Sequence, residues 1–301
     1  MGEWADSLQY RLSFHQRVPM PELPEVETTR LGLLPSVQGR RIATVTVRDR
    51  RLRWPIPKNL AKLLSGKTVT DISRRGKYLL WHCRIANTSN DRRGYLLSHL
   101  GMSGSLRVID ASDVNRTPQK HDHVDIAFEN GTTIRYTDPR RFGAMLWIAG
   151  DSPKHVLLDA LGPEPLSDDF DGAHLLAAGK GRAVSVKEFI MNSHVVVGVG
   201  NIYASEALFR AGIHPTRPAG KVSRARYVRL ADAIKYTLQS AIHAGGSSLR
   251  NYVQANGELG YFQVNASVYD REGLPCRVCG SDIRALRQGQ RSTYYCARCQ
   301  K

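Results

Sequence analysis

The segment CRVCGSDIRALRQGQRSTYYCARC, residues 276–299, contains four cysteines in two C-x2-C pairs that are separated by sixteen residues. This spacing is typical of a tetrahedral zinc site, in which each of two short turns supplies two thiolates. We therefore predict one structural Zn2+ in a small terminal hairpin, bound by Cys276, Cys279, Cys296 and Cys299. The alternatives are disulfides or four unrelated thiols. They are disfavoured because residues 1–20 carry charges and contain no apolar segment like that of an export signal.

The chain as a whole is strongly basic. Its 301 residues include 43 Lys and Arg against 27 Asp and Glu, a net charge of +16. Such a charge attracts polyanions, and with a zinc hairpin it points to nucleic acid, although charge alone would also fit an anionic membrane surface. No apolar run approaches the roughly 18 residues of a spanning helix. We expect a protein of the bacterial cytoplasm with no membrane partner.

Between residues 40 and 150 the sequence predicts strands. β-Branched stretches separated by Gly, Asn and Asp are typical of a β-rich domain, and they are RIATVTV (41–47), KTVTDI (67–72), KYLLWHC (77–83), GSLRVI (104–109), HVDIAF (123–128) and TTIRYT (132–137). The preceding segment 21–34 begins with prolines and acidic residues, which predicts a short helix that Pro35 would end. We interpret this part as a β-sandwich with a flanking helix.

Beyond a stretch rich in Pro, Gly and Asp at 150–170, the pattern becomes helical. Residues 205–213 and 223–245 predict two helices. In the second, apolar residues recur at spacings of three and four and predict one buried face: Val228, Ala231, Ile234, Leu238 and Ile242.

The segment PELPEVET (21–28) resembles the amino-terminal signature of formamidopyrimidine-DNA glycosylases. The resemblance covers the chain from Pro21 to Lys301 and continues at RRGKYLL (74–80), SHLGMSGSL (98–106), KHDHVDI (120–126), YTDPRRFG (136–143), VVGVGNIYASEALFRAGIHP (196–215) and the cysteine segment. It implies an α+β fold in three domains. We expect an extension at 1–20 that is not in the mature protein, a catalytic β-sandwich domain at 21–150, a linker at 151–165, a helix-two-turn-helix DNA-binding domain at 166–268 and a zinc finger at 269–301.

The resemblance implies a base-excision repair enzyme that removes oxidised purines from duplex DNA and cuts the strand by β,δ-elimination. A free amino-terminal proline is a secondary amine with a pKa of about 8, so Pro21 can attack a sugar carbon and form an imine. Glu22 resembles the family's general acid/base, Glu25 a supporting carboxylate, and Lys77 a contact to the lesion or its phosphate. The alternative for Pro21 is a proline that starts a helix. For Glu22 and Glu25 it is acids that stabilise the helix by interacting with its dipole, and for Lys77 it is a solvated lysine.

Further residues match the family's DNA contacts. Met102, Arg140 and Phe142 resemble the side chains that fill the hole left by an extruded base, although Met and Phe in a β-rich domain are more often core. Asn201 and Arg291 resemble phosphate contacts, with a helix N-cap as the alternative for Asn201. For His121, phosphate contact or strand-end structure is favoured over a metal pair with His123.

The sequence also departs from the family. Pro21 is preceded by twenty residues, and an acylated proline nitrogen has no lone pair for attack. We therefore expect translation from Met20 and loss of that methionine, or proteolysis; a chain retaining residues 1–20 would be a non-catalytic zinc-finger DNA-binding protein. Arg250, Glu258 and Leu259 differ from the usual lesion-covering loop. Leu23 favours the purine branch over the endonuclease VIII type, which takes oxidised pyrimidines. We expect a monomer.

Overall fold

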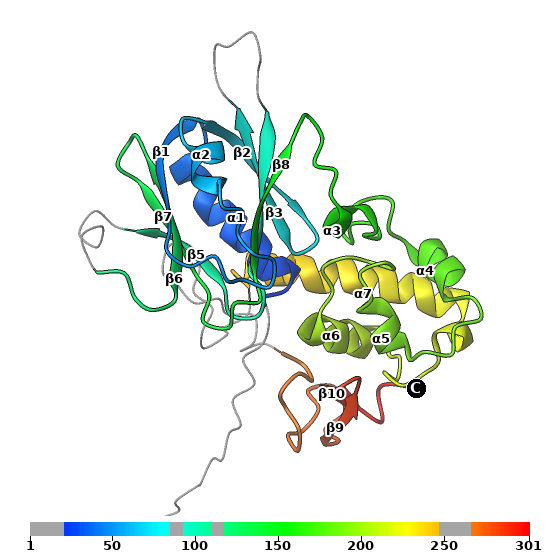
Figure 1. Ribbon diagram of the computed structural model, residues 1–301. Coiled ribbons are helices and arrows are strands. Elements are labelled where there is room, and N and C mark those ends of the chain that lie inside the picture. Colours follow the sequence, from blue (N-terminus) through cyan, green and yellow to red (C-terminus); the bar gives the residue numbers. More distant parts are fainter. Residues whose placement is uncertain (1–20, 85–92, 110–116, 247–265) are drawn as a thin grey trace, which may run out of the picture.

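The computed structural model describes residues 21–84, 93–109, 117–246 and 266–301. Arg250, Glu258 and Leu259 lie outside the described residues, as does the segment 1–20. Figure 1 shows strands at one end, a group of helices beside them, and a two-stranded hairpin against the helices. Within the described ranges, no helix has both the length and the hydropathy needed to cross a membrane.

The strand-rich part is one eight-stranded antiparallel sheet folded into two layers. Its order is β5-β7-β6-β1-β2-β3-β4-β8. Strand β1 bonds to β2 only through Arg40 and Arg41 and then pairs with β6 along residues 42–47, so the sheet folds over at β1. The strands are β1 Arg40–Val47, β2 Thr68–Arg75, β3 Tyr78–Arg84, β4 Gly94–His99, β5 Ser105–Ile109, β6 Asp122–Phe128, β7 Thr133–Thr137 and β8 Ala144–Ala149.

Helix α1, Leu23–Val37, runs past the point at which the sequence predicts its end. Pro35 lies inside it, so the prediction that Pro35 ends the helix is wrong. The proline lacks one N–H. The last turn nevertheless forms, because the amide of Gln38 donates to the Leu34 carbonyl at 2.9 Å and Leu33 and Val37 are fully buried.

The helical part places its longest helix, α7, across the others. Its helices are α3 Val156–Asp159, α4 Gly172–Gly179, α5 Val186–Ile190, α6 Asn201–Ala211, the 3-10 turn η1 Ala219–Lys221 and α7 Arg224–His243, while α2 Leu60–Leu64 belongs to the sandwich. The predicted buried face of α7 is correct for Ala231, Ile234 and Leu238. It is wrong for Val228, which is 46% exposed, because the stripe begins at buried Tyr227 and Leu230 instead.

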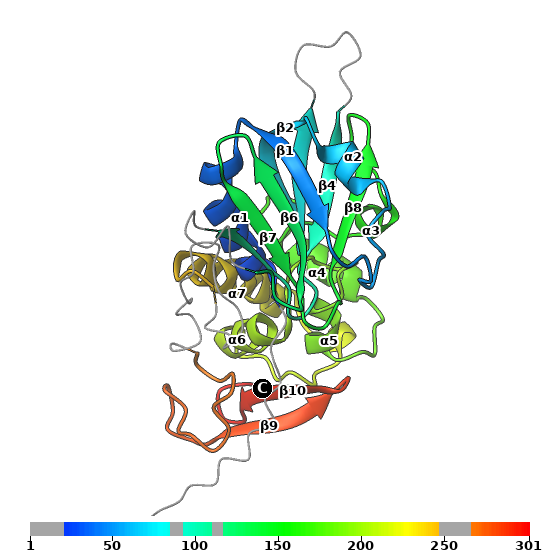
Figure 2. The ribbon, with the colours of Figure 1, turned by 60° about the vertical axis from the view of Figure 1, so that its left-hand side comes forward.

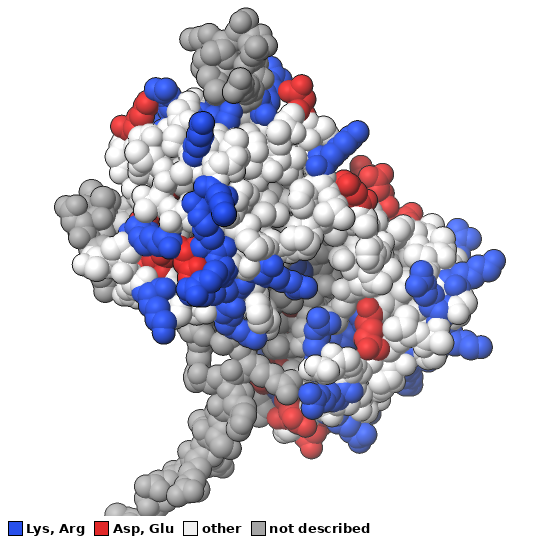
Figure 3. Space-filling model, viewed as in Figure 1, with Lys and Arg blue, Asp and Glu red and all other residues white. Residues whose placement is uncertain are grey.

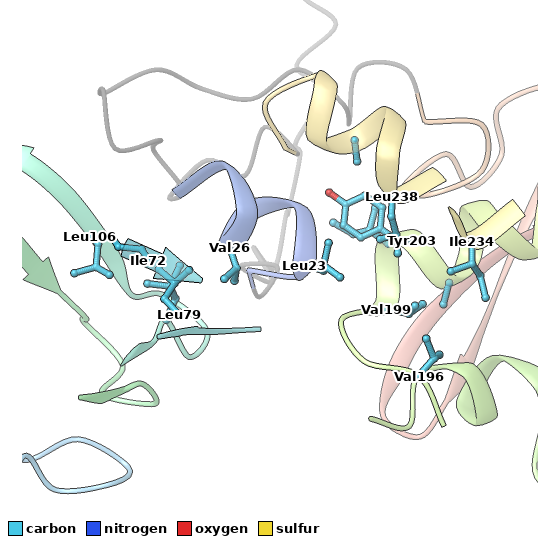
Figure 4. Packing of buried hydrophobic residues seen from close by; sticks show 14 of the residues in the cluster. Leu23, Val26, Ile72, Leu79, Leu106, Val196, Val199, Tyr203, Ile234 and Leu238 are labelled. Carbon is cyan, nitrogen blue, oxygen red and sulfur yellow. The ribbon is translucent and has the colours of Figure 1, made fainter. Parts of the chain in front are cut away.

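The first turn of α1 joins the cores of the two parts. In Figure 4, Leu23 and Val26 lie between Ile72, Leu79 and Leu106 of the sandwich on one side and Val196, Val199, Tyr203, Ile234 and Leu238 of the helices on the other. All belong to one buried apolar cluster. The beginning of α1 is therefore fixed at the junction of the two domains.

The terminal hairpin consists of β9, Ile283–Gln288, and β10, Arg291–Cys296. Gly289 and Gln290 join the strands, and both have positive φ, as a tight two-residue hairpin turn requires. Figure 2 shows the hairpin at the end of the molecule away from the sandwich, with the helices between them. These observations confirm the predicted α+β class with its sandwich, helical domain and terminal hairpin.

Candidate active site at the start of helix α1

Glu22, the residue before α1, is buried between the two domains. Pro21 next to it is also buried. Glu22 is 3% exposed, and its Oε1 accepts the backbone N–H of Ile202, at the start of α6, at 3.3 Å. A side chain at Gly200 would overlap the Glu22 carboxyl group. The glycine therefore allows the carboxyl group to lie against the backbone of the N-terminus of α6.

Burial makes the Glu22 carboxyl group a proton donor near neutral pH. Desolvation, with a smaller contribution from the charge of Glu25, raises its pKa from 4.5 to about 7, although Lys77 and the backbone amides of Ile202 and Tyr203 act in the opposite direction. Its Oε2 is buried and has no hydrogen-bond partner among the described residues. One oxygen is thus available to hold and transfer a proton.

Glu25 supports Glu22 from one turn along the helix. Its Oε2 accepts the backbone N–H of Glu22 at 2.9 Å, and its Oε1 accepts the hydroxyl of Tyr203 on α6 at 2.6 Å. The residue has no exposed surface. The carboxylate therefore both caps α1 and ties it to the helical domain, as the supporting and capping interpretations each require.

Lys77 lies in the turn between β2 and β3, next to Gly76 with φ +57. Burial lowers the pKa of Lys77, while the charges of Glu22 and Glu25 raise it and Arg291 lowers it further. Its ammonium therefore shares the electrostatic environment of the buried acids. Glu164 fixes the turn by accepting the N–H of Gly76 at 2.6 Å.

Lys187, on α5, belongs to the site, and the sequence did not indicate it. Its Nζ donates to Asn201 Oδ1 at 2.6 Å, to Thr293 Oγ1 at 2.7 Å and to the Ser292 carbonyl at 3.2 Å. Desolvation lowers its pKa to about 7, while Glu22 acts in the opposite direction. Three oxygens match the three donors of an ammonium group. Because its pKa is about 7, the amine is charged in acid and can lose a proton near neutrality.

Asn201 and Arg291 lie where α6 meets the hairpin. Asn201 is the first residue of α6 and Gly200 is its N-cap, so the N-cap alternative for Asn201 is wrong. Its Nδ2 donates to the Ser292 carbonyl at 3.0 Å. Arg291 is exposed directly after the hairpin turn, and its charge lowers the pKa of both Lys77 and Lys187. Lys187 therefore contacts Asn201 directly, and the charges of Glu22 and Arg291 act on both Lys187 and Lys77.

Met102, Arg140 and Phe142 lie on two adjacent loops of the sandwich. Met102 follows β4 and is half-buried, whereas Phe142, between β7 and β8, is 43% exposed, so the core alternative is wrong for Phe142. The guanidinium of Arg140 lies 4.9 Å from the centre of the Phe142 ring. Figure 3 shows Lys and Arg gathered on both domains beside the hollow between them.

His121 lies next to β6 and His123 lies on it. Their ring centres are 6.4 Å apart, and the buried His123 contacts the Asp138 carbonyl through Nε2 at 2.8 Å. His121 is half-buried. In the ranges that the structure describes, the one group of three or more residues placed to hold a metal is the cysteine quartet.

The four cysteines converge as a zinc site requires. Their sulfur atoms lie within 4.8 Å of one another, with Cys279 and Cys296 at 3.4 Å and Cys276 and Cys299 at 3.9 Å. A tetrahedral Zn–S4 centre has S–S edges of about 3.8 Å. All four are free thiols, which excludes the disulfide alternative in this structure. The donor set and spacing fit one structural zinc.

Three family models together match most of the chain. They are the formamidopyrimidine-DNA glycosylase N-terminal domain at residues 20–145, the formamidopyrimidine-DNA glycosylase H2TH domain at 161–253, and the zinc finger found in FPG and IleRS at 273–301. Among curated relatives, formamidopyrimidine-DNA glycosylase of Methylococcus capsulatus is 56% identical over 282 residues, which is 94% of this chain and 100% of the relative. The same enzyme of Stutzerimonas stutzeri is 55% identical over 283 residues, with the same coverage of both chains.

Solved structures agree with these matches. The MutM (Fpg) protein of Thermus thermophilus superposes with a TM-score of 0.80 at 37% identity, covering 93% of this chain and 98% of that one. Lactococcus lactis Fpg with abasic-site DNA gives 0.81 at 33%, covering 93% and 99%. The same protein with Fapy-dG DNA gives 0.80 at 33%, covering 93% and 100%.

Proposed function

Since the chain belongs to the formamidopyrimidine-DNA glycosylase family, we propose that it removes oxidised purines, namely 8-oxoguanine and formamidopyrimidines, from duplex DNA. It then cuts the strand at the abasic site by β- and δ-elimination. The observation that carries the proposal is the buried carboxyl group of Glu22, with a pKa of about 7, directly beside Pro21. A secondary amine and a neutral-range acid side by side are what imine chemistry on a sugar needs.

The residues divide the chemistry between them. The nitrogen of Pro21 forms a bond to C1′ as the bond from C1′ to the base breaks; the base leaves with the electron pair and takes up the proton that the amine nitrogen loses. Protonated Glu22 donates its proton to the ribose ring oxygen, which opens the sugar and leaves an iminium. The positive charge of the iminium acidifies C2′–H. Loss of that proton expels the 3′ phosphate, and a second elimination expels the 5′ phosphate.

Lys77 and the remaining predicted residues hold the DNA. Lys77, beside Glu22, contacts the lesion or its phosphate, and Asn201, Arg291 and His121 contact backbone phosphates. Arg140 hydrogen-bonds the orphaned base while Met102 and Phe142 fill the gap. The zinc-bound hairpin supports this arrangement by positioning Arg291, which adjoins Ser292 and its contacts to Asn201 and Lys187.

The reactive nitrogen must be a free amine, so the active form begins at Pro21. Translation from Met20 with removal of that methionine is the favoured route, and proteolysis is the second. The N-terminal family model begins its match at residue 20, and 94% of this chain covers the whole Methylococcus capsulatus relative, which supports this route. The proposed domains are 21–150, 151–165 as linker, 166–268 and 269–301. We expect a monomer that acts on nucleoid DNA in the bacterial cytoplasm.

Borohydride trapping tests the proposal. Protein beginning at Pro21 should form a covalent adduct with a duplex containing 8-oxoguanine opposite cytosine, because the reductant traps the imine, whereas protein retaining residues 1–20 should form none. Pro21→Gly should lose only part of the trapping, since a terminal glycine amine substitutes weakly. The natively expressed chain should have the intact mass of a protein that starts at Pro21.

The outcomes separate the alternatives. Trapping on oxidised pyrimidines but not on oxidised purines would assign the endonuclease VIII type of activity. Binding to DNA without any adduct, from protein that begins at Pro21, would assign a non-catalytic binder and end the covalent mechanism.

A further inference from the structure

The two loops that carry Met102, Arg140 and Phe142 are joined by one buried carboxylate, that of Asp138. One loop, residues 100–104, follows β4, and the other, residues 138–143, joins β7 to β8. Asp138 has no exposed surface. It makes no contact that the proposed chemistry uses, so its burial needs a separate explanation.

The Asp138 carboxylate accepts hydrogen bonds from three directions. Its Oδ1 accepts the Ser103 hydroxyl of the first loop at 2.8 Å, and its Oδ2 accepts the N–H of Gly143 in the second loop at 2.9 Å and the hydroxyl of Tyr136 on β7 at 3.1 Å. Ser103 Oγ in turn accepts the N–H of Arg140 at 3.1 Å. One side chain therefore links both loops to the sheet.

The backbone of the second loop is held in a strained form. Arg141 has φ +59, a left-handed conformation that a residue with a side chain rarely adopts. Three contacts maintain it: the Arg141 N–H donates to the Asp138 carbonyl at 3.3 Å, the Arg141 carbonyl accepts the N–H of Arg53 at 2.7 Å, and the guanidinium pairs with Asp49 at 2.7 Å. This turn separates Arg140 from Phe142, whose side chains nevertheless stack.

The two loops pack closely around Asp138. A side chain at Gly143 would overlap the Tyr136 hydroxyl, and one at Gly101 would overlap the backbone of Phe142 and Gly143. The two loops are thus in direct contact at Gly101. All three groups that face the carboxylate oxygens are donors, which suits an ionised carboxylate because it only accepts.

We propose that Asp138 is a positioning residue that orders both loops before DNA binds, so that Met102, Arg140 and Phe142 enter the duplex together as one preformed wedge. This inference rests on the proposed function, because it takes the three side chains to be the residues that replace an extruded base. A wedge that is already ordered does not lose conformational freedom at the moment of insertion. Asp138 therefore acts on the extrusion of a stacked base and not on the chemistry at the sugar.

Asp138→Asn tests this most directly, because it keeps the shape but presents an amide N–H2 to groups that are donors. Single-turnover rates are measured, with protein beginning at Pro21, on two duplexes: one containing 8-oxoguanine opposite cytosine and one containing a preformed abasic site. Excision of the lesion should slow by about tenfold or more, while cleavage at the abasic site, where no base is stacked, should change by less than about threefold.

Ser103→Ala and Asp125→Asn are the companion variants. Ser103→Ala removes the hydrogen bond from the half-buried Ser103 hydroxyl to Asp138. It should also slow excision more than abasic-site cleavage, by a smaller factor than Asp138→Asn does. Asp125 is a carboxylate of the same sheet that pairs with Arg48 and Arg135. Asp125→Asn should change both rates alike. If Asp138→Asn fails to fold, Ser103→Ala alone decides.

Equal losses on both substrates, or unchanged excision in Asp138→Asn or Ser103→Ala, would overturn the positioning role. Fluorescence of 2-aminopurine placed next to the lesion reports base extrusion and should rise more slowly in both variants. If unaltered protein forms no borohydride adduct, the proposed function fails; if it does and the variants behave like it, only the role of Asp138 fails.

Discussion

At the residue scale, the proposed chemistry requires Glu22 to be acidic enough to give up a proton and basic enough to hold one at neutral pH. Its pKa of about 7 results mainly from burial, and Lys77 limits the rise. A carboxyl group exposed to water would be ionised at this pH and could not act as a general acid. The buried position of Glu22 between the two domains therefore supports its proposed role as a general acid.

The pH dependence of catalysis tests this. We expect kcat/KM for the abasic-site substrate to fall as pH rises above about 7, as Glu22 loses its proton, and Glu22→Gln to lose that limb together with about a hundredfold or more of the rate. Pre-steady-state rates between pH 5 and 9 measure both effects. Glu129→Gln, an exposed carboxyl group of the sandwich, serves as the control and should keep the profile. An unchanged alkaline limb in Glu22→Gln would assign the acid to another residue.

Stability provides a second measurement of the same group. The folded state raises the pKa of Glu22 from 4.5 to about 7, so between these values it binds a proton that the unfolded chain releases. The contribution of Glu22 to the free energy of unfolding is therefore largest below pH 4.5. It falls by about 3 kcal/mol as pH rises from there through 7. Glu22→Gln removes this loss, so its Tm relative to the unaltered protein should be higher at pH 8 than at pH 5.

The sequence identified Glu22 but not Lys187, and the difference is physical. Glu22 lies in a contiguous motif beside Pro21, where the chemistry can be inferred from neighbours. Lys187 is tied to the site by its contacts to Asn201, Ser292 and Thr293, which are up to 106 positions away. Asp138 lies in the motif YTDPRRFG (136–143), but its hydrogen bonds come from two loops that only the fold brings together.

At the element scale, strands β1, β2, β3, β5, β6 and β7 were predicted from the sequence, whereas β4 and β8 were not. Strands β4 and β8, GYLLSH and AMLWIA, are apolar runs with little alternation, and their pairing with each other and with β3 makes them strands. Helices α3, α4 and α5 have four, eight and five residues, too few to show a helical period. The extension of α1 past Pro35 depended on the burial of Val37, a tertiary effect.

Glu206 on α6 holds the segment that leads into the zinc hairpin. Its carboxylate, 7% exposed, accepts the backbone N–H groups of Ser267, Val268 and Tyr269, each at 2.9 Å. Glu206→Ala leaves three donors without this acceptor and should lower the free energy of unfolding by about 3 kcal/mol. Glu206→Gln, with one oxygen, should lower it less.

Thermal unfolding and amide hydrogen exchange at residues 267–269 measure the effect of Glu206→Ala. Exchange there should accelerate, while exchange in the sandwich stays as it is. The exposed Glu272 is the matched control, and Glu272→Gln should change neither quantity. A loss of stability below about 0.5 kcal/mol in Glu206→Ala would show that solvent replaces the carboxylate at little cost.

At the scale of the whole molecule, one continuous core spans the sandwich and the helices, and the hairpin has a small core of its own. The large cluster extends from Val69 of β2 through Leu23 of α1 to Leu238 of α7. The hairpin cluster consists of Val268, Ile283 and two of the cysteines. The hairpin docks through polar contacts, such as those of Lys187, and through Phe209 of α6. Its own core is small and contains two of the metal ligands, so its order depends on the metal much more than the rest of the protein does.

Removal of zinc should therefore separate DNA binding from the stability of the sandwich. After chelation, we expect the hairpin to lose its structure, Arg291 to lose its fixed position, and affinity for lesion-containing duplex to fall by at least about a hundredfold. The main thermal transition should move little, since the large core does not contain the ligands. Fluorescence anisotropy and calorimetry on the same sample measure the two quantities.

Cys83, buried in β3, is the control thiol, and Cys83→Ser should retain zinc and DNA affinity. If the variant with serine at all four ligand positions binds DNA normally, the hairpin does not contribute to DNA affinity, and the basic surface of the two larger domains must supply it.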